Sequence, residues 1–394
     1  MFIKRIPAAA LIASPALAGP LTPPAGAVAP TGLTLQQVAD QAESRIAINQ
    51  QNTPSGGSAL FEINQPGSYY LTGDVSGVSG GFGIRVNVPN VTIDLNGFAV
   101  RGLPGSTSGI FLNRADSSTI RNGSVSGWGN QGIRATNSTG VRLIDLIASD
   151  NVANGFQLGD AAFIYRCAAL RNVEDGFNMG RASSIVDCQS ERNMGSGIRT
   201  GLGSIARGCT TQQNVDDGIS AGTGSSVIDC VSREDGVHGV DAASSCIVRG
   251  CNIFDSGTYG IDLSSFGTAT GNSVSRAGTA GINVAGDCLA ENNIVTGTGS
   301  VNPAIGIRVF SSDSRIQGNQ LSGNATGILG TSSFGGSIFI GNALSGNIKA
   351  FELPAGNFVG PIVTPAATTA AIDGTTTSGS IGIGTTDPYA NIVY

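Results

Sequence analysis

Glycine followed by a large apolar residue recurs along the chain at regular intervals. The steps between these marker glycines are 26, 23 and 23 residues, then six steps of 21, then 25 and 21. The pairs are Gly83-Ile84, Gly109-Ile110, Gly132-Ile133, Gly155-Phe156, Gly176-Phe177, Gly197-Ile198, Gly218-Ile219, Gly239-Val240, Gly260-Ile261, Gly281-Ile282, Gly306-Ile307 and Gly327-Ile328. A unit of about 21 residues holds three short strands and three turns and cannot bury its apolar side alone. The pattern therefore predicts stacked coils that share one core.

Polar residues recur at two further positions of the same period. Twelve or thirteen residues after most marker glycines stand Asn96, Asn122, Asp145, Cys167, Cys188, Cys209, Cys230, Cys251, Asn272, Asn293 and Asn319. About five residues later stand Asn172, Asn193, Asn214, Asp235 and Asn324. Equivalent residues of stacked parallel coils lie about 4.8 Å apart, so neighbouring asparagines can bond through their side-chain amides. We expect asparagine ladders at the turns.

The segments before the first regular repeats read QPGSYYLTGDV (residues 65–75) and VNVPNVTIDLNGFAVRG (residues 86–102). Together with the glycine marks and the asparagine ladder, they resemble the right-handed parallel β-helix repeat proteins of the pectate-lyase-like superfamily. The resemblance spans roughly residues 60 to 345. It implies an all-β fold, a single-stranded right-handed parallel β-helix of about twelve coils. It leaves function open, because this superfamily holds lyases, hydrolases, epimerases, esterases and non-catalytic proteins.

The N-terminus has the features of an export signal. Lys4 and Arg5 precede a short apolar run, and Ala16-Leu17-Ala18 is an A-x-A cleavage motif, so residues 1–18 should be a signal peptide. The protein is expected to be secreted, periplasmic or at the cell surface. No apolar run is long enough to span a membrane as a helix.

Four segments are expected overall. After the signal peptide, residues 19–60 should hold a flexible proline-rich stretch and a capping helix over residues 33–48. The β-helix should occupy residues 61–350, and residues 351–394 form a low-complexity tail. The helix is expected from the helical spacing of Leu35, Val38, Ala42 and Ile46.

Charge and composition narrow the partners. The chain has 59 glycines, 12% charged and 6% aromatic residues, and a net charge of −6, which becomes −8 without Lys4 and Arg5. Nucleic acid is a poor partner for such a protein, because neutralising phosphates requires clustered Lys and Arg. We expect Trp128, the single tryptophan, to plug a loop against the core rather than to stack on a sugar.

Five of the seven cysteines follow the repeat at steps of 21 residues, from Cys167 to Cys251. Parallel side chains on adjacent coils hold their Cβ atoms too far apart for a disulfide, so a buried thiol ladder is expected. Cys246 and Cys288 are two coils apart and cannot pair. A metal-thiolate site is not expected, because His238 is the only imidazole and no C-x2-C motif exists.

Stacking also brings acidic residues together in the middle of the β-helix. The residues before successive marker glycines are Asn154, Asp175, Ser196, Asp217, His238 and Tyr259. The second residues after successive glycines are Arg199, Ser220, Asp241, Asp262 and Asn283. Asp217 and His238 should therefore be direct neighbours, within a strip that also holds Asp175, Arg199 and Tyr259.

The stretch VDDGIS followed by GVHGV resembles the Asp-Asp and Gly-His-Gly elements of polygalacturonase-type glycoside hydrolases. The resemblance implies catalytic roles for Asp216, Asp217 and His238, with one carboxylic acid protonating the leaving oxygen and one carboxylate activating water. Asp175, Arg199, Asp241, Tyr259 and Asp262 would then bind substrate. The Asn-Thr-Asp element of that family is replaced by residues 193–197, NMGSG, and its Arg-Ile-Lys element is absent.

Two other interpretations of the strip remain. Asp and Asn before glycine are turn formers whose side chains bond the local backbone, with no catalysis. No cofactor is expected, although Asp241 and Asp262 could hold Ca²⁺ in a lyase-type site. The leading functional interpretation is a non-catalytic exported protein associated with extracellular polysaccharide. The alternatives are a polysaccharide-degrading hydrolase or lyase, and an adhesin or fibre-like protein.

Overall fold

The computed structural model describes residues 45–297, 305–331, 335–364 and 387–394, all of which belong to one unit. Every regular element among these residues is a β-strand. Most of the expected capping helix lies outside the described residues. Its described end contradicts the expectation, because Ile46–Ala47 forms strand β1 and pairs with β3. Strand β3 has a free edge at Tyr69 and Tyr70, and pairing with it satisfies the backbone hydrogen-bonding groups of β1. The spacing of apolar residues along the sequence does not reveal such an edge.

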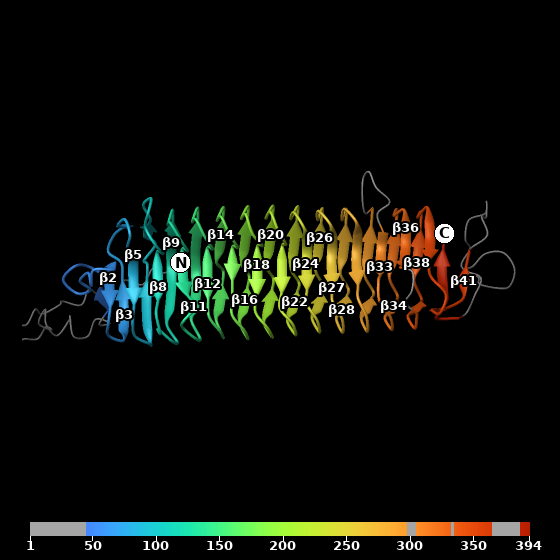
Figure 1. The fold of residues 1–394 in the computed structure, drawn as a ribbon, viewed down its shortest axis with the longest axis horizontal. Coiled ribbons are helices and arrows are strands. Elements are labelled where there is room, and N and C mark those ends of the chain that lie inside the picture. The colour runs from blue at the N-terminus through green and yellow to red at the C-terminus, as the bar shows by residue number, and fades with distance from the viewer. Residues whose placement is uncertain (1–44, 298–304, 332–334, 365–386) are drawn as a thin grey trace, which may run out of the picture. The chain divides into compact units, whose positions relative to one another are not determined.

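All described strand pairs are parallel, and each coil adds one strand to each wall of a β-solenoid (Figure 1). Fourteen strands form the sheet that we call the site sheet. They are β2 (Ala59–Ile63), β5 (Phe82–Val86), β8 (Ile110–Leu112), β10 (Ile133–Ala135), β12 (Phe156–Leu158), β15 (Phe177–Asn178), β18 (Ile198–Thr200), β21 (Ile219–Ala221), β24 (His238–Ala242), β27 (Tyr259–Leu263), β30 (Ala280–Val284), β33 (Ile305–Val309), β36 (Thr326–Gly330) and β39 (Lys349–Glu352).

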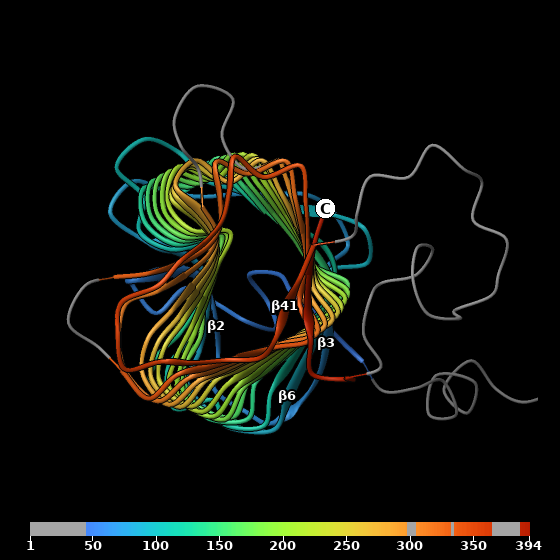
Figure 2. The same cartoon turned by 90° about the vertical axis from the view of Figure 1, so that its right-hand side faces the viewer.

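The other strands form the sheet that we call the second sheet, which supplies two walls of each regular coil. Viewed along the stack, successive coils superimpose and surround the core (Figure 2). Its strands are β1, β3 (Gly67–Tyr70), β4 (Val75–Ser76), β6 (Val91–Asp94), β7 (Ala99–Arg101), β9 (Thr119–Ser126), β11 (Arg142–Ser149), β13 (Phe163–Tyr165), β14 (Ala168–Leu170), β16 (Ser184–Val186), β17 (Gln189–Glu191), β19 (Ile205–Arg207), β20 (Thr210–Gln212), β22 (Ser226–Ile228), β23 (Val231–Arg233), β25 (Ile247–Arg249), β26 (Asn252–Phe254), β28 (Thr268–Thr270), β29 (Ser273–Ser275), β31 (Leu289–Glu291), β32 (Ile294–Thr296), β34 (Arg315–Gln317), β35 (Gln320–Ser322), β37 (Ile338–Ile340), β38 (Ala343–Ser345), β40 (Phe358–Val359), β41 (Ile362–Val363) and β42 (Asn391–Val393).

The solenoid has about fourteen coils rather than the expected twelve. The two additional coils lie at its ends, where the marker glycine is absent. The register of β2 on β5 places Leu60 at the marker position of the first coil. The register of β36 on β39 places Ala350 there in the last. A terminal coil has a neighbour on one side only, so a side chain is tolerated there.

The marker glycines are required by the close approach of adjacent coils. A Cβ added to Gly218 would lie 2.6 Å from the carbonyl oxygen of Gly239, which is the marker glycine of the next coil. The same contact recurs along the stack, for example 2.6 Å from Gly197 to the oxygen of Gly218. Real Cβ atoms do not approach a carbonyl oxygen this closely, so the 21-residue glycine pattern records steric contact between coils.

Side-chain ladders line the turns as expected. Asn172 donates through its side-chain amide to Oδ1 of Asn193 at 2.9 Å, and Asn193 repeats this to Asn214. Asn214 donates in the same way to Asp235, which ends that run of amides. The second ladder runs through cysteines into asparagines, because the backbone nitrogen of Cys251 donates to Oδ1 of Asn272.

The cysteine prediction is confirmed. All seven cysteines are free and buried. The backbone nitrogen of Cys167 donates to Sγ of Cys188 at 3.3 Å, which places the two thiols one above the other. Trp128 is also fully buried, and its Nε1 donates to the carbonyl of Val100 at 3.0 Å, so it plugs the core.

The polar position twelve or thirteen residues after most marker glycines, predicted as one column, consists of two adjacent columns. Asn96, Asn122 and Asp145 have φ between 53° and 61° and stand one residue before the cysteine column. Their structural equivalents are Arg166 and Asp187, which also have positive φ. Asn and Asp tolerate this left-handed conformation, so they are favoured at this turn position, which lies one residue before the cysteine column.

The last strand of the chain joins the final coils. Strand β42 pairs with β38 on one side and with β41 on the other. Asn391 is fully buried and extends the asparagine ladder, since Oδ1 of Asn391 accepts the backbone nitrogen of Asn342 at 3.0 Å. Part of the expected low-complexity tail is therefore a structural strand.

Candidate functional site

One outward-facing residue from each strand of the site sheet forms a continuous line, which we call the strand column. Its members pair in register from coil to coil. They are Glu62, Arg85, Phe111, Arg134, Gln157, Asn178, Arg199, Ser220, Asp241, Asp262, Asn283, Arg308, Leu329 and Glu352. Most of these side chains can donate or accept hydrogen bonds.

The side chains of the strand column are less exposed to solvent than many outward-facing side chains of the second sheet. From Arg134 to Arg308, its side chains are half-buried or buried. Outward positions of the second sheet include exposed apolar residues such as Phe163, Ile205 and Ile247. The site sheet therefore presents a partly enclosed polar surface.

A second line, which we call the glycine-preceding column, borders the first. It contains Gln131, Asn154, Asp175, Ser196, Asp217, His238 and Tyr259. Its two acids bond the backbone of the next coil: Oδ1 of Asp175 accepts the nitrogen of Ser196 at 2.9 Å, and Oδ1 of Asp217 accepts that of His238 at 3.1 Å. One oxygen of each acid therefore bonds the backbone at a turn, which is the non-catalytic role considered for these residues from the sequence.

The second oxygen of Asp217 is available for chemistry. The side chain is only 7% exposed, and among the described residues no donor is bonded to Oδ2. Burial raises the pKa of Asp217 to about 7, and the charges of Asp216 and Asp241 contribute to the rise. A carboxyl group with this pKa can donate or accept a proton near neutral pH.

Arg199 links two of the acids. Its Nε lies 2.9 Å from Oδ2 of Asp175, and its Nη2 lies 3.6 Å from Oδ2 of Asp216. Asn178 also donates to Oδ2 of Asp175, at 3.0 Å. Both oxygens of Asp175 are thus engaged, which leaves it less free than Asp217 to act as a proton carrier.

His238 and Tyr259 stack with ring centroids 5.1 Å apart and planes inclined by 5°. The Nε2 of His238 lies 3.8 Å from Oδ2 of Asp262, while its Nδ1 is buried and finds no hydrogen-bond partner in the described part of the chain. Arg308, which lies two coils further along, donates to the hydroxyl of Tyr259 at 3.0 Å. An acidic, an imidazole, a phenol and a guanidinium group thus meet within a few coils.

Asp241 and Asp262, the pair considered for Ca²⁺, are register partners on β24 and β27. Burial and the charge of Asp262 raise the pKa of Asp241. Asn283 donates to Oδ1 of Asp262 at 2.8 Å. Throughout the described part of the chain, no group of three or more His, Cys, Asp and Glu side chains is arranged to hold a metal ion.

All eight residues singled out in the sequence therefore lie on adjacent coils of one face, although their catalytic and binding roles stay predictions. Arg308 was missed, and so was the basic and aromatic part of the strand column, which includes Arg85, Phe111 and Arg134. The available signal was position: each of these residues stands two places after a marker glycine.

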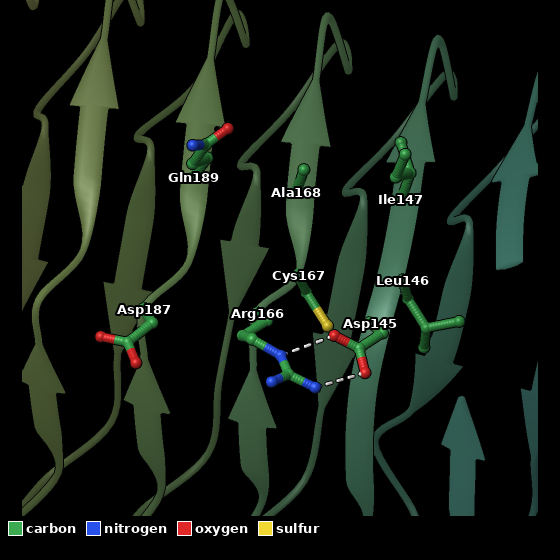
Figure 3. A pocket seen from close by; sticks show the side chains of 8 residues that line it. All are labelled: Asp145, Leu146, Ile147, Arg166, Cys167, Ala168, Asp187 and Gln189. Atoms are coloured by element: carbon green, nitrogen blue, oxygen red, sulfur yellow. Dashed lines mark hydrogen bonds and ion pairs between the residues drawn. The ribbon is translucent and has the colours of Figure 1, made fainter. Parts of the chain in front are cut away.

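A separate hollow of about 400 Å³ lies on the second sheet at the bend between its two walls (Figure 3). Two of its charged groups form an ion pair, since Nη2 of Arg166 lies 2.7 Å from Oδ2 of Asp145. It also contains Cys167, which is 2% exposed. We therefore place the candidate site on the site sheet, where polar atoms lack partners.

Comparison with known families identifies two matches. Residues 76–231 match the family described as "Right handed beta helix region". Residues 203–379 match the family described as "Periplasmic copper-binding protein (NosD)". No curated protein sequence matches the chain.

Similar solved structures share the fold at low sequence identity. The A-modules of the mannuronan C-5 epimerases AlgE6 and AlgE4 of Azotobacter vinelandii are 14% and 15% identical to the chain, with TM-scores of 0.53 and 0.51. Each match covers 75% of this chain and 91% of the module. A mutant tailspike protein of E. coli bacteriophage HK620, solved with a pentasaccharide, is 12% identical with a TM-score of 0.50, covering 92% of this chain and 80% of that one.

The residues described here do not fit a copper site. Copper sites use clustered imidazole, thiolate or thioether ligands. The chain has one histidine and three methionines, and its cysteines form a buried column. We therefore derive no chemistry through copper.

No helix in the described part of the chain is long and apolar enough to cross a membrane. The parallel coils, the side-chain ladders and the family match over residues 76–231 agree with one another. Residues 76–231 are a right-handed β-helix region, and the chain has the parallel β-solenoid fold that is also found in the mannuronan epimerase modules.

Proposed function

We propose that the protein binds an extended polysaccharide along the site sheet and works outside the cytoplasm. The observation that carries this proposal is the strand column from Arg134 to Arg308, an unbroken line of polar side chains, half-buried or buried, across parallel strands. Adjacent positions lie about 4.8 Å apart, which is close to the length of a sugar unit, so a glycan could meet a new polar group at each coil.

The comparisons support the same class of ligand. Mannuronan epimerase modules and a tailspike solved with a pentasaccharide have similar folds. The location is supported by the expected signal peptide at residues 1–18 and by the periplasmic description of the family matched by residues 203–379.

A blocking substitution tests the binding surface. Ser220 lies at the middle of the strand column between Arg199 and Asp241, and Ser226 faces outward from the second sheet on the same coil. Ser220→Trp should weaken polysaccharide binding at least about tenfold, which corresponds to 1.4 kcal/mol. Ser226→Trp, of the same size change and also half-buried, should bind like wild type. Affinity electrophoresis over neutral and acidic polymers measures both.

Two outcomes would end the proposal. If no polymer retards the wild-type protein, the proposed polysaccharide binding is refuted. If both variants bind equally, the site sheet is not the binding surface.

The pKa of Asp217 favours a second candidate function, acid–base chemistry on the bound glycan. Asp216, Asp217 and His238 would carry it, with Asp175, Arg199, Asp241, Tyr259 and Asp262 contacting substrate. Wild type and Asp217→Asn should be compared for new reducing ends, for unsaturated products and, by NMR, for changed sugar stereochemistry. A product made by wild type and lost in Asp217→Asn supports catalysis; no product from any polymer leaves binding alone.

A further inference from the structure

Four side chains at the N-terminal part of the site sheet form a cluster that we call the arginine–phenylalanine cluster. Arg85, Phe111 and Arg134 are consecutive members of the strand column. Phe82 joins them from the glycine-preceding column and stacks on Phe111, with ring centroids 4.8 Å apart and planes inclined by 20°.

Phe111 holds the two cations in place. The guanidinium carbon of Arg134 lies 5.3 Å from the centroid of the Phe111 ring, and that of Arg85 lies 5.9 Å from it. An aromatic face attracts cations through its quadrupole. Because Phe111 is only 9% exposed, its ring serves as the base of the cluster and positions the two guanidinium groups.

Arg134 is half-buried, and a half-buried guanidinium group requires hydrogen-bond acceptors. Its Nε is buried without a hydrogen-bond partner, and the described residues supply it with no ion pair. The other three arginines of the column have side-chain partners: Arg199 pairs with Asp175, Arg308 with the hydroxyl of Tyr259, and Arg85 with Ser58. Arg134 is thus the arginine of the column to whose side chain the described residues supply neither a hydrogen bond nor an ion pair.

Neighbouring polar atoms are unsatisfied as well. Arg85 donates to Ser58 at 2.7 Å and lies 3.9 Å from Glu62, but its Nε is buried and has no partner among the described residues. The same holds for the hydroxyl of Thr107. Buried donors without acceptors are unfavourable, and they gather where a ligand can supply the acceptors.

The ligand chemistry follows from these donors. A guanidinium group has five N–H donors in a planar fork that matches the oxygens of carboxylate or sulfate. Phe82 is half-buried and stacks on Phe111, the ring over which both guanidinium groups lie, so it can contact the apolar face of a sugar ring.

We propose that the arginine–phenylalanine cluster is a subsite for the carboxylate or sulfate of an acidic saccharide unit, with Arg134 as its main anion-binding group. This inference rests on the proposed polysaccharide-binding function. It also gives the site sheet a direction. Asp241 and Asp262 lie five and six coils beyond Arg134 and would repel anions, so the charged units of a glycan should be held at the Arg134 end.

Affinity electrophoresis with three polymers tests the subsite: a polyuronate, a sulfated dextran and unmodified dextran. Arg134→Gln should weaken binding of the acidic polymer about 10- to 100-fold, as expected for charge-assisted hydrogen bonds. Arg142→Gln is the matched control, since Arg142 is an exposed arginine on the second sheet, and should change affinity less than twofold. The acidic polymer that loses affinity identifies the anion as carboxylate or sulfate.

Arg134→Lys, which keeps the charge but loses the fork, should fall between wild type and Arg134→Gln, and thermal unfolding verifies that each variant is folded. If Arg134→Gln and Arg142→Gln bind acidic polymers alike, the subsite is refuted. If wild type binds only the neutral polymer, the subsite is refuted while the proposed function stands. If wild type binds none of the polymers, both are refuted.

Discussion

At the scale of single residues, the stacked neighbour decides what a side chain does. Asp217 and His238 are 21 residues apart, and the repeat correctly predicts that they meet. The spacing does not reveal that Asp217 is almost completely buried or that Asp216 and Asp241 lie close enough to affect it. The burial and the charged neighbours of Asp217 depend on how the turns pack over the strand. The length of the repeat does not contain this information.

The pKa of Asp217 predicts how stability depends on pH. Its folded value of about 7 lies above the unfolded value of about 3.9, so the native state binds the extra proton between these pH values. The free energy of unfolding should therefore fall as pH rises from about 4 to 7, by roughly 1–4 kcal/mol for this group. Asp217→Asn removes this loss while retaining an oxygen for the nitrogen of His238.

Denaturant unfolding at pH 4, 6 and 8 measures the effect. Asp217→Asn should be more stable than wild type at pH 8, with the difference shrinking towards pH 4. Asp187→Asn, an exposed acid on the second sheet, serves as the control and should follow the wild-type curve. If the free energies of unfolding of wild type and Asp217→Asn depend on pH in the same way, burial does not raise the pKa of Asp217.

At the scale of the coil, the glycines carry the repeat because the coils touch there. A Cβ at Gly218 would lie 2.6 Å from the carbonyl oxygen of Gly239, 2.5 Å from Oδ2 of Asp235 and 2.6 Å from Oγ1 of Thr211. Two of these three contacts are with the next coil. The sequence therefore revealed a tertiary contact through its period, although not which atoms make it.

Alanine substitution distinguishes a packed glycine from an open one. Gly218→Ala should lower the free energy of unfolding by about 1–3 kcal/mol, as overpacking does. Gly73→Ala should change it by less than about 0.5 kcal/mol, because a Cβ there would meet no atom within 4 Å. Equal effects of the two substitutions would contradict the steric explanation of the repeat.

At the scale of the whole solenoid, the end of the chain closes the last coils. Strand β42 lies between β38 and β41, and Nδ2 of Asn391 donates to the carbonyl of Phe339 at 3.1 Å. In a stack of coils each unit contacts only its neighbours, so the loss of an end should act locally.

Removal of residues 387–394 should therefore loosen the last coils and leave the middle unchanged. Hydrogen exchange should become faster in β38 (Ala343–Ser345), whose edge loses its partner, and stay the same in β20 (Thr210–Gln212). Tyr394→Ser, which changes only an exposed side chain, should leave both rates as in wild type. Unchanged exchange in β38 after truncation would show that β42 does not stabilise this end.

The sequence by itself determined the parallel coils, their ladders and the face on which the acidic residues gather. These properties follow from residue identity repeated at a fixed step, and a fixed step places equivalent residues directly above one another. It determined neither the coil number nor the start of the fold, because the terminal coils lack the marker and β1 is not a helix.

Only the tertiary structure decided which polar groups are satisfied. Arg308 reaches Tyr259 across 49 residues, Asn391 joins Asn342 across the same sequence separation, and Nε of Arg134 has no hydrogen-bond partner among the described residues. Pairing, burial and pKa depend on the exact height and direction of side chains on several coils. A periodic pattern specifies the column in which a residue stands, whereas the folded coils determine what it can bond.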